Sequence, residues 1–372
     1  MKLSDDEGDS FMLNRRNILI GAGAAAVAGG AAWALAPHAD PASLAAALRA
    51  PMPPDDDLHT LAHYATLAAN SHNTQPWLFS KDGDRVAIAP DLARATPAAD
   101  ANHHHVFASL GCAAENLALA AAAAGRPAAI GYAADADRVA IDLAGGGAAR
   151  DPLFEAITAR QCTRSLYDGR AVPADDLKRI EQAAALSGAR VLIVTDATRI
   201  EQVLEMVVAA NTAQVEDPAF RAELKDWLRF GPRKAADTRD GLFSACSGNP
   251  TLPDWLGRAI FDFVFTAEGE NDRYAAQIRS SSGLAIVVSD ANDKAHWVEA
   301  GRSVQRFALA ATVLGVRHAF INQPLEVPSK REEFARWLGD DGLSPDLIVR
   351  FGYAEPMPWS LRRPVDEVIA QA

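Results

Sequence analysis

The sequence is poor in cysteine. Only three cysteines occur among 372 residues, Cys112, Cys162 and Cys246, which are too few and too odd in number for a disulfide framework. None of them stands in a metal-ligand pair. Redox chemistry by this chain would therefore need a bound cofactor.

Positive charge is also scarce. The chain has 36 Lys and Arg residues against 48 Asp and Glu residues, which gives a formal net charge of -12. Because such a surface repels nucleic acid and anionic lipid, we expect neither as a partner. A small anionic ligand would need a local cluster of arginines to hold it.

Aromatic residues make up 7% of the chain and hydrophobic residues 49%, and alanine supplies most of the apolar surplus. This composition is normal for a soluble globular protein and predicts many closely packed helices. The length allows two domains of ordinary size, or one large two-part domain with a well-buried core.

The N-terminus has no stretch long enough to be a confident membrane span. Arg15 and Arg16 precede a weakly hydrophobic Ala/Gly run from Gly21 to Ala36. Paired arginines before such a run predict a twin-arginine export signal over residues 1–36. We therefore expect a periplasmic or otherwise exported protein that is carried by the twin-arginine machinery. Passengers of this route travel folded, which favours a protein that acquires a cofactor first.

Two alternatives stay open for this segment. Residues 18–26 could form the strand, glycine turn and helix of a dinucleotide-binding unit, with Asp40 as its ribose-binding acid. No β-branched run in residues 31–40 supplies the second strand, so the export signal is favoured. Residues 34–36 are typical of a signal-peptidase site, but Pro37 would hinder cutting, and an uncut segment would stay as a membrane anchor.

An internal repeat predicts a duplicated architecture. Residues 111–125 and 301–315 are similar Ala-rich helical segments that carry small residues on one side, and each ends in glycine. Chance similarity between two alanine-rich helices is the alternative. Their matching length, cap and position before a strand favour duplication.

The rest of the chain divides into segments by composition. Short apolar runs predict strands at 86–88, 191–194, 284–288 and 318–321. An irregular stretch with several aromatic residues, 211–282, would lie over a site as a helical lid. The predicted segments are a signal (1–36), a Pro/Asp linker (37–57), a first half (58–150) and a second half (151–372) that includes this lid.

Residues 70–77 are the first candidate for binding a planar, anionic ligand. Short polar side chains from Asn70 to Gln75 gather at a helix end, and Pro76 forces an extended exit. Their amide and backbone donors suit the edge of a heteroaromatic ring. An ordinary helix-to-strand turn explains the same residues equally well.

The two other candidate segments are basic. Arg160 and Arg164 are spaced to lie on one face of a helix end, where they can fork onto a phosphate. A solvated face beside nearby acidic residues is the alternative. Arg362 and Arg363 precede a short helix near the C-terminus, although basic pairs in tails usually have no function.

Together these segments resemble the nitroreductase superfamily. Residues 71–77 are similar to its signature that ends in Asn-x-Gln-Pro-Trp, Arg160-x-x-x-Arg164 resembles its opening phosphate-binding motif, and residues 351–365 resemble its closing phosphate-contacting segment. In ordinary nitroreductases the arginine motif comes first, whereas here it follows the Asn-Gln-Pro-Trp motif. That order resembles the Acg-like branch, in which one chain mimics the usual homodimer. The resemblance covers roughly residues 55–372.

This resemblance implies an α+β fold, a pseudo-dimer of two mixed-sheet halves flanked by helices, with 111–125 and 301–315 as paired central helices. It also implies FMN at the interface between the halves. The side chains implied to hold the FMN phosphate are Arg160, Arg164, Arg362 and Arg363. Those implied to face its isoalloxazine and ribityl groups from the other half are Ser71, His72, Asn73 and Gln75.

Each half lacks the motif that the other half has. Residues 53–57 stand where an arginine motif would be needed, and residues 186–189 stand where the Asn-Gln-Pro-Trp signature would fall. We therefore expect one FMN per chain, rather than the two of a symmetric homodimer, and a monomeric protein.

The implied activity is FMN-dependent oxidoreduction. A donor would reduce the flavin and leave, and a small nitroaromatic- or quinone-like acceptor would follow in ping-pong order. No side chain is assigned a catalytic role, because no general acid or base is demanded. Since nicotinamide cofactors are scarce outside the cytoplasm, the leading alternative is a protein that sequesters FMN without turnover. A more remote alternative is an unrelated periplasmic small-molecule binder.

Two motifs are set aside. The first motif is a run of three histidines, His103 to His105, which could indicate a metal site. However, the side chains of adjacent residues point apart and cannot converge on one ion. We interpret them as surface or interface residues and predict no metal. Ser71 is not a hydrolase nucleophile, because no Gly-x-Ser-x-Gly elbow surrounds it.

Overall fold

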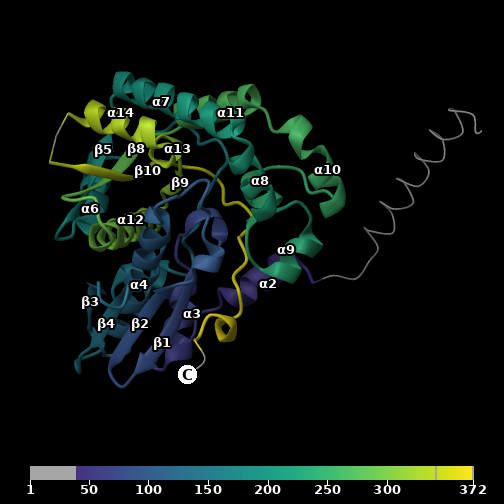
Figure 1. Cartoon of the computed structure of the whole chain (residues 1–372). Helices are drawn as coiled ribbons and strands as arrows, with labels where there is room; N and C mark the ends of the chain where they lie inside the picture. The colour runs from purple at the N-terminus through teal and green to yellow at the C-terminus, as the bar shows by residue number, and fades with distance from the viewer. Residues whose placement is uncertain (1–38, 340–341, 371–372) are drawn as a thin grey trace, which may run out of the picture. The chain divides into compact units, whose positions relative to one another are not determined.

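The computed structural model describes residues 39–339 and 342–370. The predicted export signal lies outside the described residues. The described part is arranged around two four-stranded sheets, which Figure 1 shows with their helices.

The first sheet is built from a short, mostly local stretch of chain. Helix α3 (Leu58–Thr66) begins where the Asp57 side chain accepts a hydrogen bond from the Thr60 backbone N–H. Strands β1 (Trp77–Asp82) and β2 (Arg85–Pro90) form a hairpin that turns at Gly83, whose φ is +55°. Helix α4 (His104–Ala123), β3 (Ala128–Ala133) and β4 (Arg138–Leu143) follow, and the strand order is β1-β2-β4-β3.

The second sheet repeats this order. Its strands are β5 (Ala189–Val194), β8 (Gly283–Ser289), β9 (Arg317–Phe320) and β10 (Ser344–Gly352), arranged β5-β8-β10-β9. When the strands of each sheet are numbered in chain order, both sheets have the strand order 1-2-4-3. The equivalent helices are α6 (Ala174–Ala184), which precedes β5, and α12 (Lys294–Val313), which connects β8 to β9. Identical order and equivalent helices are what a duplication predicts.

The α+β pseudo-dimer fold class is confirmed, with one refinement to the expectation of mixed sheets. Every pairing between named strands of the two four-stranded sheets is antiparallel. Parallel contacts to these sheets are single bridges, Phe79 with Ile369 and Cys162 with His318. The first bridge brings the C-terminal tail of the second half to the edge of the first sheet, where Phe79 also bonds to Val368 and Ala370.

The two repeat helices cross at their equivalent glycines. A Cβ atom added to Gly111 of α4 would lie 2.0 Å from the Val298 carbonyl oxygen, and one added to Gly301 of α12 would lie 1.9 Å from that of Ala108. The two contacts are equivalent: Gly111 faces Val298, three residues before Gly301, and Gly301 faces Ala108, three residues before Gly111. Only glycine allows backbones this close. The prediction of paired central helices is confirmed.

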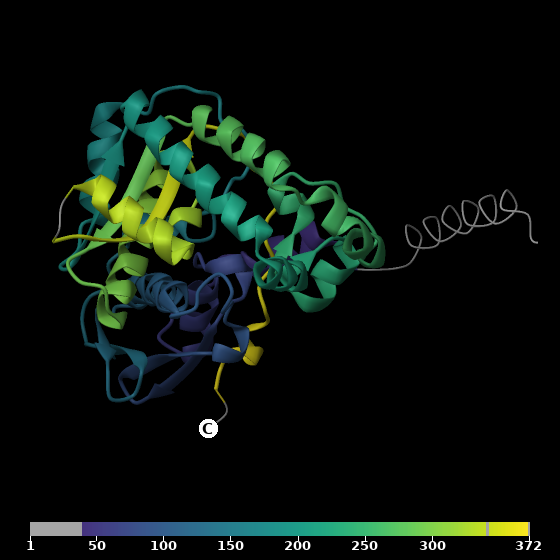
Figure 2. The same cartoon turned by 45° about the horizontal axis from the view of Figure 1, so that its top comes forward.

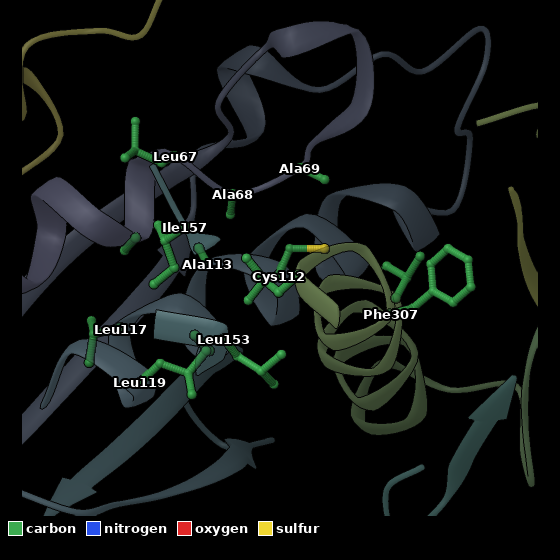
Figure 3. Packing of buried hydrophobic residues seen from close by; sticks show 14 of the residues in the cluster. Leu67, Ala68, Ala69, Cys112, Ala113, Leu117, Leu119, Leu153, Ile157 and Phe307 are labelled. Atoms are coloured by element: carbon green, nitrogen blue, oxygen red, sulfur yellow. The ribbon is translucent and has the colours of Figure 1, made fainter. Parts of the chain in front are cut away.

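The main hydrophobic core surrounds this crossing. Figure 3 shows Cys112 of α4 between Leu117 of the same helix and Phe307 of α12, and all three are buried in one cluster. The cluster also includes buried residues of α5 (Pro152–Ala156) and of both sheets. Among the described helices, α4 is long and apolar enough to span a membrane, but 89% of its apolar window is buried inside the protein, as befits a core helix.

A helical insertion separates β5 from β8. In the first half the equivalent strands are joined by the hairpin at Gly83, whereas here the chain forms α7 (Ala197–Glu216), α8 (Pro218–Trp227), α9 (Pro232–Thr238), α10 (Asp254–Val264) and α11 (Ala267–Arg279). A two-residue parallel pair, β6 (Leu228–Arg229) with β7 (Leu242–Phe243), lies among them. Figure 2 shows α8 to α10 extending to one side of the second sheet. Helices α13 (Gln323–Glu326) and α14 (Pro328–Leu338) lie between β9 and β10.

The segment expected to be a linker, 37–57, contains a packed helix. Helix α2 (Pro41–Leu48) begins where Asp40 accepts hydrogen bonds from two backbone N–H groups, and it packs against α9. Ala45 of α2 is buried with Ala235 and Phe243 of the insertion and with Leu361 of the tail. Helix α2, the insertion and the C-terminal tail therefore share a small hydrophobic core that is separate from the main one.

The helix crossing gives a stability prediction. Gly111→Ala forces a methyl group into the Val298 carbonyl and should lower the free energy of unfolding by about 3 kcal/mol or more, as severe overpacking does. Gly131→Ala is the matched control, because Gly131 has ordinary φ and a Cβ there meets nothing within 4 Å. Urea unfolding of both variants measures the difference. Equal stability of the two would show that the helices do not approach this closely.

Candidate functional site

A cavity of about 520 Å³ lies where the turn after α3, the central helices and the insertion meet. This volume suits a cofactor-sized ligand. More than half of the residues that line it come from the insertion. Those that carry the argument below are Asn70, Ser71, His72, His105, Ser109, Cys112, Arg164, Gln214, Phe261, Tyr274 and Glu326.

The turn that was predicted to contact the cofactor is strained. His72, Asn73 and Gln75 all have positive φ, between 45° and 56°, although none is glycine. Such residues cost of order 1–3 kcal/mol each and gather at functional sites. The Asn70 side chain accepts a hydrogen bond from the Gln75 N–H, and the Ser109 hydroxyl accepts one from the Ser71 N–H, which fix the turn against α4.

The structure divides the predicted turn residues into two groups. Ser71 and His72 line the cavity, together with Asn70. Asn73 and Gln75 do not line it, and their side chains bond to other segments instead. Asn73 donates to the carbonyls of Gly241 and Leu361, and Gln75 donates to that of Arg239. These two amides therefore tie the insertion and the tail to the turn.

Arg160 and Arg164 were expected at a helix end, but this expectation is wrong, because α5 ends at Ala156 and both arginines lie in the non-helical chain after it. The four predicted arginines are divided as the turn residues are. Arg164 lines the cavity, and within the described residues its guanidinium has no hydrogen-bond or ion-pair partner. Arg160 and Arg362 are buried beside the same loop, where Arg160 donates to the Leu67 carbonyl and Arg362 to those of Thr66 and Ala68. Arg363 is different, since its charge is offset by Asp91 at 3.9 Å and Glu367 at 3.6 Å.

Sequence reasoning missed a third buried arginine, Arg49. It lies just after α2, stacks 4.1 Å above the Trp359 ring, and donates to the Arg160 carbonyl. Burial first, and then the charge of Arg160, lower the pKa of Arg362 to about 9. Burial and the charges of Arg362 and Arg160 also lower the pKa of Arg49. No carboxylate within the described ranges pairs with any of the three. A buried positive cluster of this kind favours an anion.

Cys162 lies within the same arginine cluster. Its sulfur is 3.6 Å from Nη1 of Arg160 and 4.0 Å from Nε2 of His318. Burial acts to raise the pKa of the Cys162 thiol, but His318 and the charge of Arg160 together lower it to about 5. Charge at this thiol partly offsets the buried guanidinium groups.

His72 is held neutral by its surroundings. Burial, and after it the nearby charge of Arg164, lowers the pKa of His72 from 6.5 to about 4. The imidazole that lines the cavity is therefore an uncharged hydrogen-bonding group at neutral pH.

A protonatable carboxyl lies at another wall of the cavity. Burial raises the pKa of Glu326, which accepts a hydrogen bond from the Gln214 amide at 2.7 Å. His105 lies beyond it, with Nδ1 3.7 Å from the Glu326 carboxylate. Sequence reasoning assigned no proton-handling side chain, because Glu326 is more than 200 residues from His105 and nothing local marks it.

The three adjacent histidines diverge, as helical geometry predicted. His103 has a left-handed backbone and caps α4, His104 contacts Asp346 of β10 at 3.0 Å, and His105 turns to the cavity wall. Arg331 can only donate to Nδ1 of His104, so Nε2 carries the proton and faces the Asp346 carboxylate. Within the described ranges, no group of three potential ligands is placed to hold a metal ion.

The opposite flank of the helix crossing carries an ion-pair network. Counted from the two glycines, the equivalents of the cavity residues Ser109 and Cys112 are Glu299 and Arg302. Arg302 pairs with Glu299 at 2.8 Å and with Glu115 at 3.0 Å, and Arg306 also pairs with Glu115 at 2.7 Å. Side chains thus fill the position that symmetry would assign to a second site.

Comparisons with curated proteins point to one group. The chain is 24% identical over 340 residues to “Putative NAD(P)H nitroreductase Rv3131” of Mycobacterium tuberculosis, which covers 87% of this chain and 94% of that protein. It is 23% identical over 336 residues to “Putative NAD(P)H nitroreductase acg” of the same organism, covering 84% and 95%. The resemblance to the Acg-like nitroreductases is confirmed. No family model matches the chain.

Similar solved structures carry the same description. A nitroreductase with bound FMN from Desulfitobacterium hafniense is 16% identical and aligns with 60% of this chain and 100% of its own, at a TM-score of 0.37. One from Bacteroides fragilis, also with bound FMN, is 20% identical and aligns with 55% and 90%, at a TM-score of 0.34.

The charge environment of His72 gives a pH prediction. Its folded-state pKa, about 4, is below the ordinary 6.5, so protonation disfavours the folded state and stability is lost as pH falls through this window. His72→Asn removes the titration while keeping a side chain that tolerates positive φ. The variant should lose less stability than the parent between pH 6.5 and 4, by at most about 1.4 kcal/mol per pH unit. Thermal unfolding at pH 7.5 and 5 measures this, and parallel losses would contradict it.

Proposed function

We propose that this protein is an FMN-dependent oxidoreductase of the nitroreductase type, with one flavin in the cavity beside Arg164. One observation carries the proposal: the Arg164 guanidinium, which has no partner in the part of the chain that the structure describes, lines a cofactor-sized cavity. The strained turn, the central helices and the insertion form the walls of this cavity. An unpaired charge in such a place favours a ligand with a negative group.

The residues present fit FMN at both of its ends. Arg164, with the buried cluster of Arg49, Arg160 and Arg362 beside it, suits a dianionic phosphate. Apolar side chains of the insertion, among them Phe261, give a wall that suits a flat ring. Arg363 is left out of this set because Asp91 and Glu367 already offset its charge.

The polar residues of the cavity would orient the ligand and supply a proton. Bound FMN would provide the hydride and electron chemistry, from a donor to a nitroaromatic- or quinone-like acceptor. Asn70, Ser71 and neutral His72 present hydrogen-bonding groups from one wall. On another wall the buried Glu326 carboxyl, whose pKa is raised by burial, can hold a proton and give it to a reduced acceptor. The insertion excludes water above them.

A single flavin per chain follows from the asymmetry of the two flanks. One flank has the cavity, and the other has the ion pairs of Glu115, Glu299, Arg302 and Arg306. Because the pseudo-dimer already contains both halves of the interface, the protein can act as a monomer. Reconstitution that yields a flavin-to-protein ratio near two would contradict this.

The phosphate assignment is tested by removing charge. Arg164→Ala should weaken FMN binding by about 1–3 kcal/mol, the usual loss of a charged hydrogen bond. Arg190→Ala is the control, because Arg190 is an exposed residue of β5 whose partner is Asp290 and it does not line the cavity. Fluorescence titration with FMN measures both affinities. Unchanged affinity in Arg164→Ala would refute the assignment.

Sequestration of FMN without turnover is the second candidate function. The insertion favours it, because it supplies most of the cavity wall and so covers any ligand there. Export by the twin-arginine route, which we propose from the Arg15–Arg16 motif and which cell fractionation tests, would also remove the protein from NAD(P)H.

Anaerobic reduction of the bound flavin separates the two functions. We expect bleaching of its visible absorbance by NADH, NADPH or a quinol, followed by recovery when a quinone or nitroaromatic compound is added. The apoprotein mixed with free riboflavin serves as the control for direct reaction. Failure of all three donors would favour sequestration.

A further inference from the structure

Helix α10 of the insertion exposes large apolar side chains. Trp255 is 63% exposed, Phe263 is 83% exposed and Val264 is 64% exposed. The other exposed large apolar residues of the described chain, Leu92, Leu166 and Val313, belong to separate elements. Scattered apolar residues need no explanation, but several on one helix mark an interaction surface.

These residues share one face of the helix. Trp255, Ala259 and Phe263 follow one another at intervals of four residues, and all three are exposed. Ile260 and Val264 continue the face around the helix, and both also line the cavity. The apolar face, defined here by these five residues, therefore leads from the solvent to the mouth of the cavity.

The rest of α10 holds the helix in the insertion. Phe261 is buried, stacks on Phe265 at 4.8 Å and lies edge-on to Phe230. Charged residues occupy the remaining side: Asp262 pairs with Lys225 at 2.8 Å, and Arg258 pairs with Asp226 at 2.8 Å. The helix thus has an anchored side, a charged side and an apolar face with nothing on it in the described part of the chain.

The position of α10 indicates which kind of partner its apolar face can bind. Helix α9 of the same insertion contacts α2, the first described helix, and α2 directly follows the hydrophobic stretch of residues 18–36. An apolar face that is continuous with a cavity mouth, on an insertion that contacts the helix following the weakly hydrophobic run in sequence, suits a lipid bilayer. The net charge of -12 would oppose an anionic surface, so the matching surface is zwitterionic.

We propose that the apolar face of α10 docks on a zwitterionic lipid bilayer and opens the cavity to lipid-soluble aromatic ligands. Tryptophan and phenylalanine are the side chains that enter the boundary between headgroups and acyl chains. The charged side of α10, with Arg258 and Asp262, stays in water. This docking stands apart from the flavin chemistry, because no step of it needs FMN.

Hydrogen–deuterium exchange of the full chain tests the docking. With phosphatidylcholine vesicles, amide exchange in residues 254–264 should slow roughly tenfold, since binding opposes local opening of the helix. Exchange in α6, which is largely exposed and distant in sequence, should not change. The Trp255→Ser, Phe263→Ser double variant should lose the protection, and unchanged exchange in its central helices would show that it folds.

Quenching provides an independent measurement at one side chain. Vesicles of brominated phosphatidylcholine should quench part of the tryptophan fluorescence, and Trp255→Phe should remove that part. Any tethering by residues 18–36 is the same in parent and variants, so it cannot produce these differences. Three results would overturn the proposal: vesicle-bound protein without protection in α10, equal protection in the double variant, or protection that rises with protein concentration without vesicles. The last result would identify a second copy of the chain as the partner.

Discussion

The close crossing of α4 and α12 is the contact on which the rest of the structure depends. Because Gly111 and Gly301 lack side chains, the two backbones touch, and the sheets that follow each helix take equivalent places around them. This contact fuses two halves into one core. It also creates two equivalent flanks, one on each side of the crossing, and every difference between those flanks then comes from side chains.

Side chains give the two flanks opposite electrostatics. On one flank, Glu115 and its arginine partners satisfy each other and fill the space. On the other, the Arg164 guanidinium has no partner among the described residues, and no carboxylate of the described chain pairs with the buried guanidinium groups nearby. Buried unpaired charge and strained backbone at His72 both cost stability. Binding of a ligand can offset this loss of stability. The unpaired charge and the strained backbone therefore occur together at the cavity.

The insertion turns an open flank into an enclosed site. It replaces a short hairpin of the first half with five helices, and it is fixed at its inner end by hydrogen bonds from Asn73 and Gln75. Its outer helix, α10, faces the cavity with Phe261 and the solvent with Phe263. One element therefore determines both how the cavity is covered and what kind of surface lies at its mouth.

The sequence by itself determined features that depend on near neighbours: the strands at 86–88, 191–194, 284–288 and 318–321, the glycine ends of the repeat helices, and the turn before Pro76. These follow from local periodicity and backbone preference. Only the tertiary structure decided which side chains share the cavity. Asn73 bonds to the carbonyls of Gly241 and Leu361 and does not line it, Asp91 pairs with Arg363, and Arg49 joins from a segment expected to be a linker. Each of these outcomes depends on contacts between segments far apart in the chain, and local spacing carries no information about them.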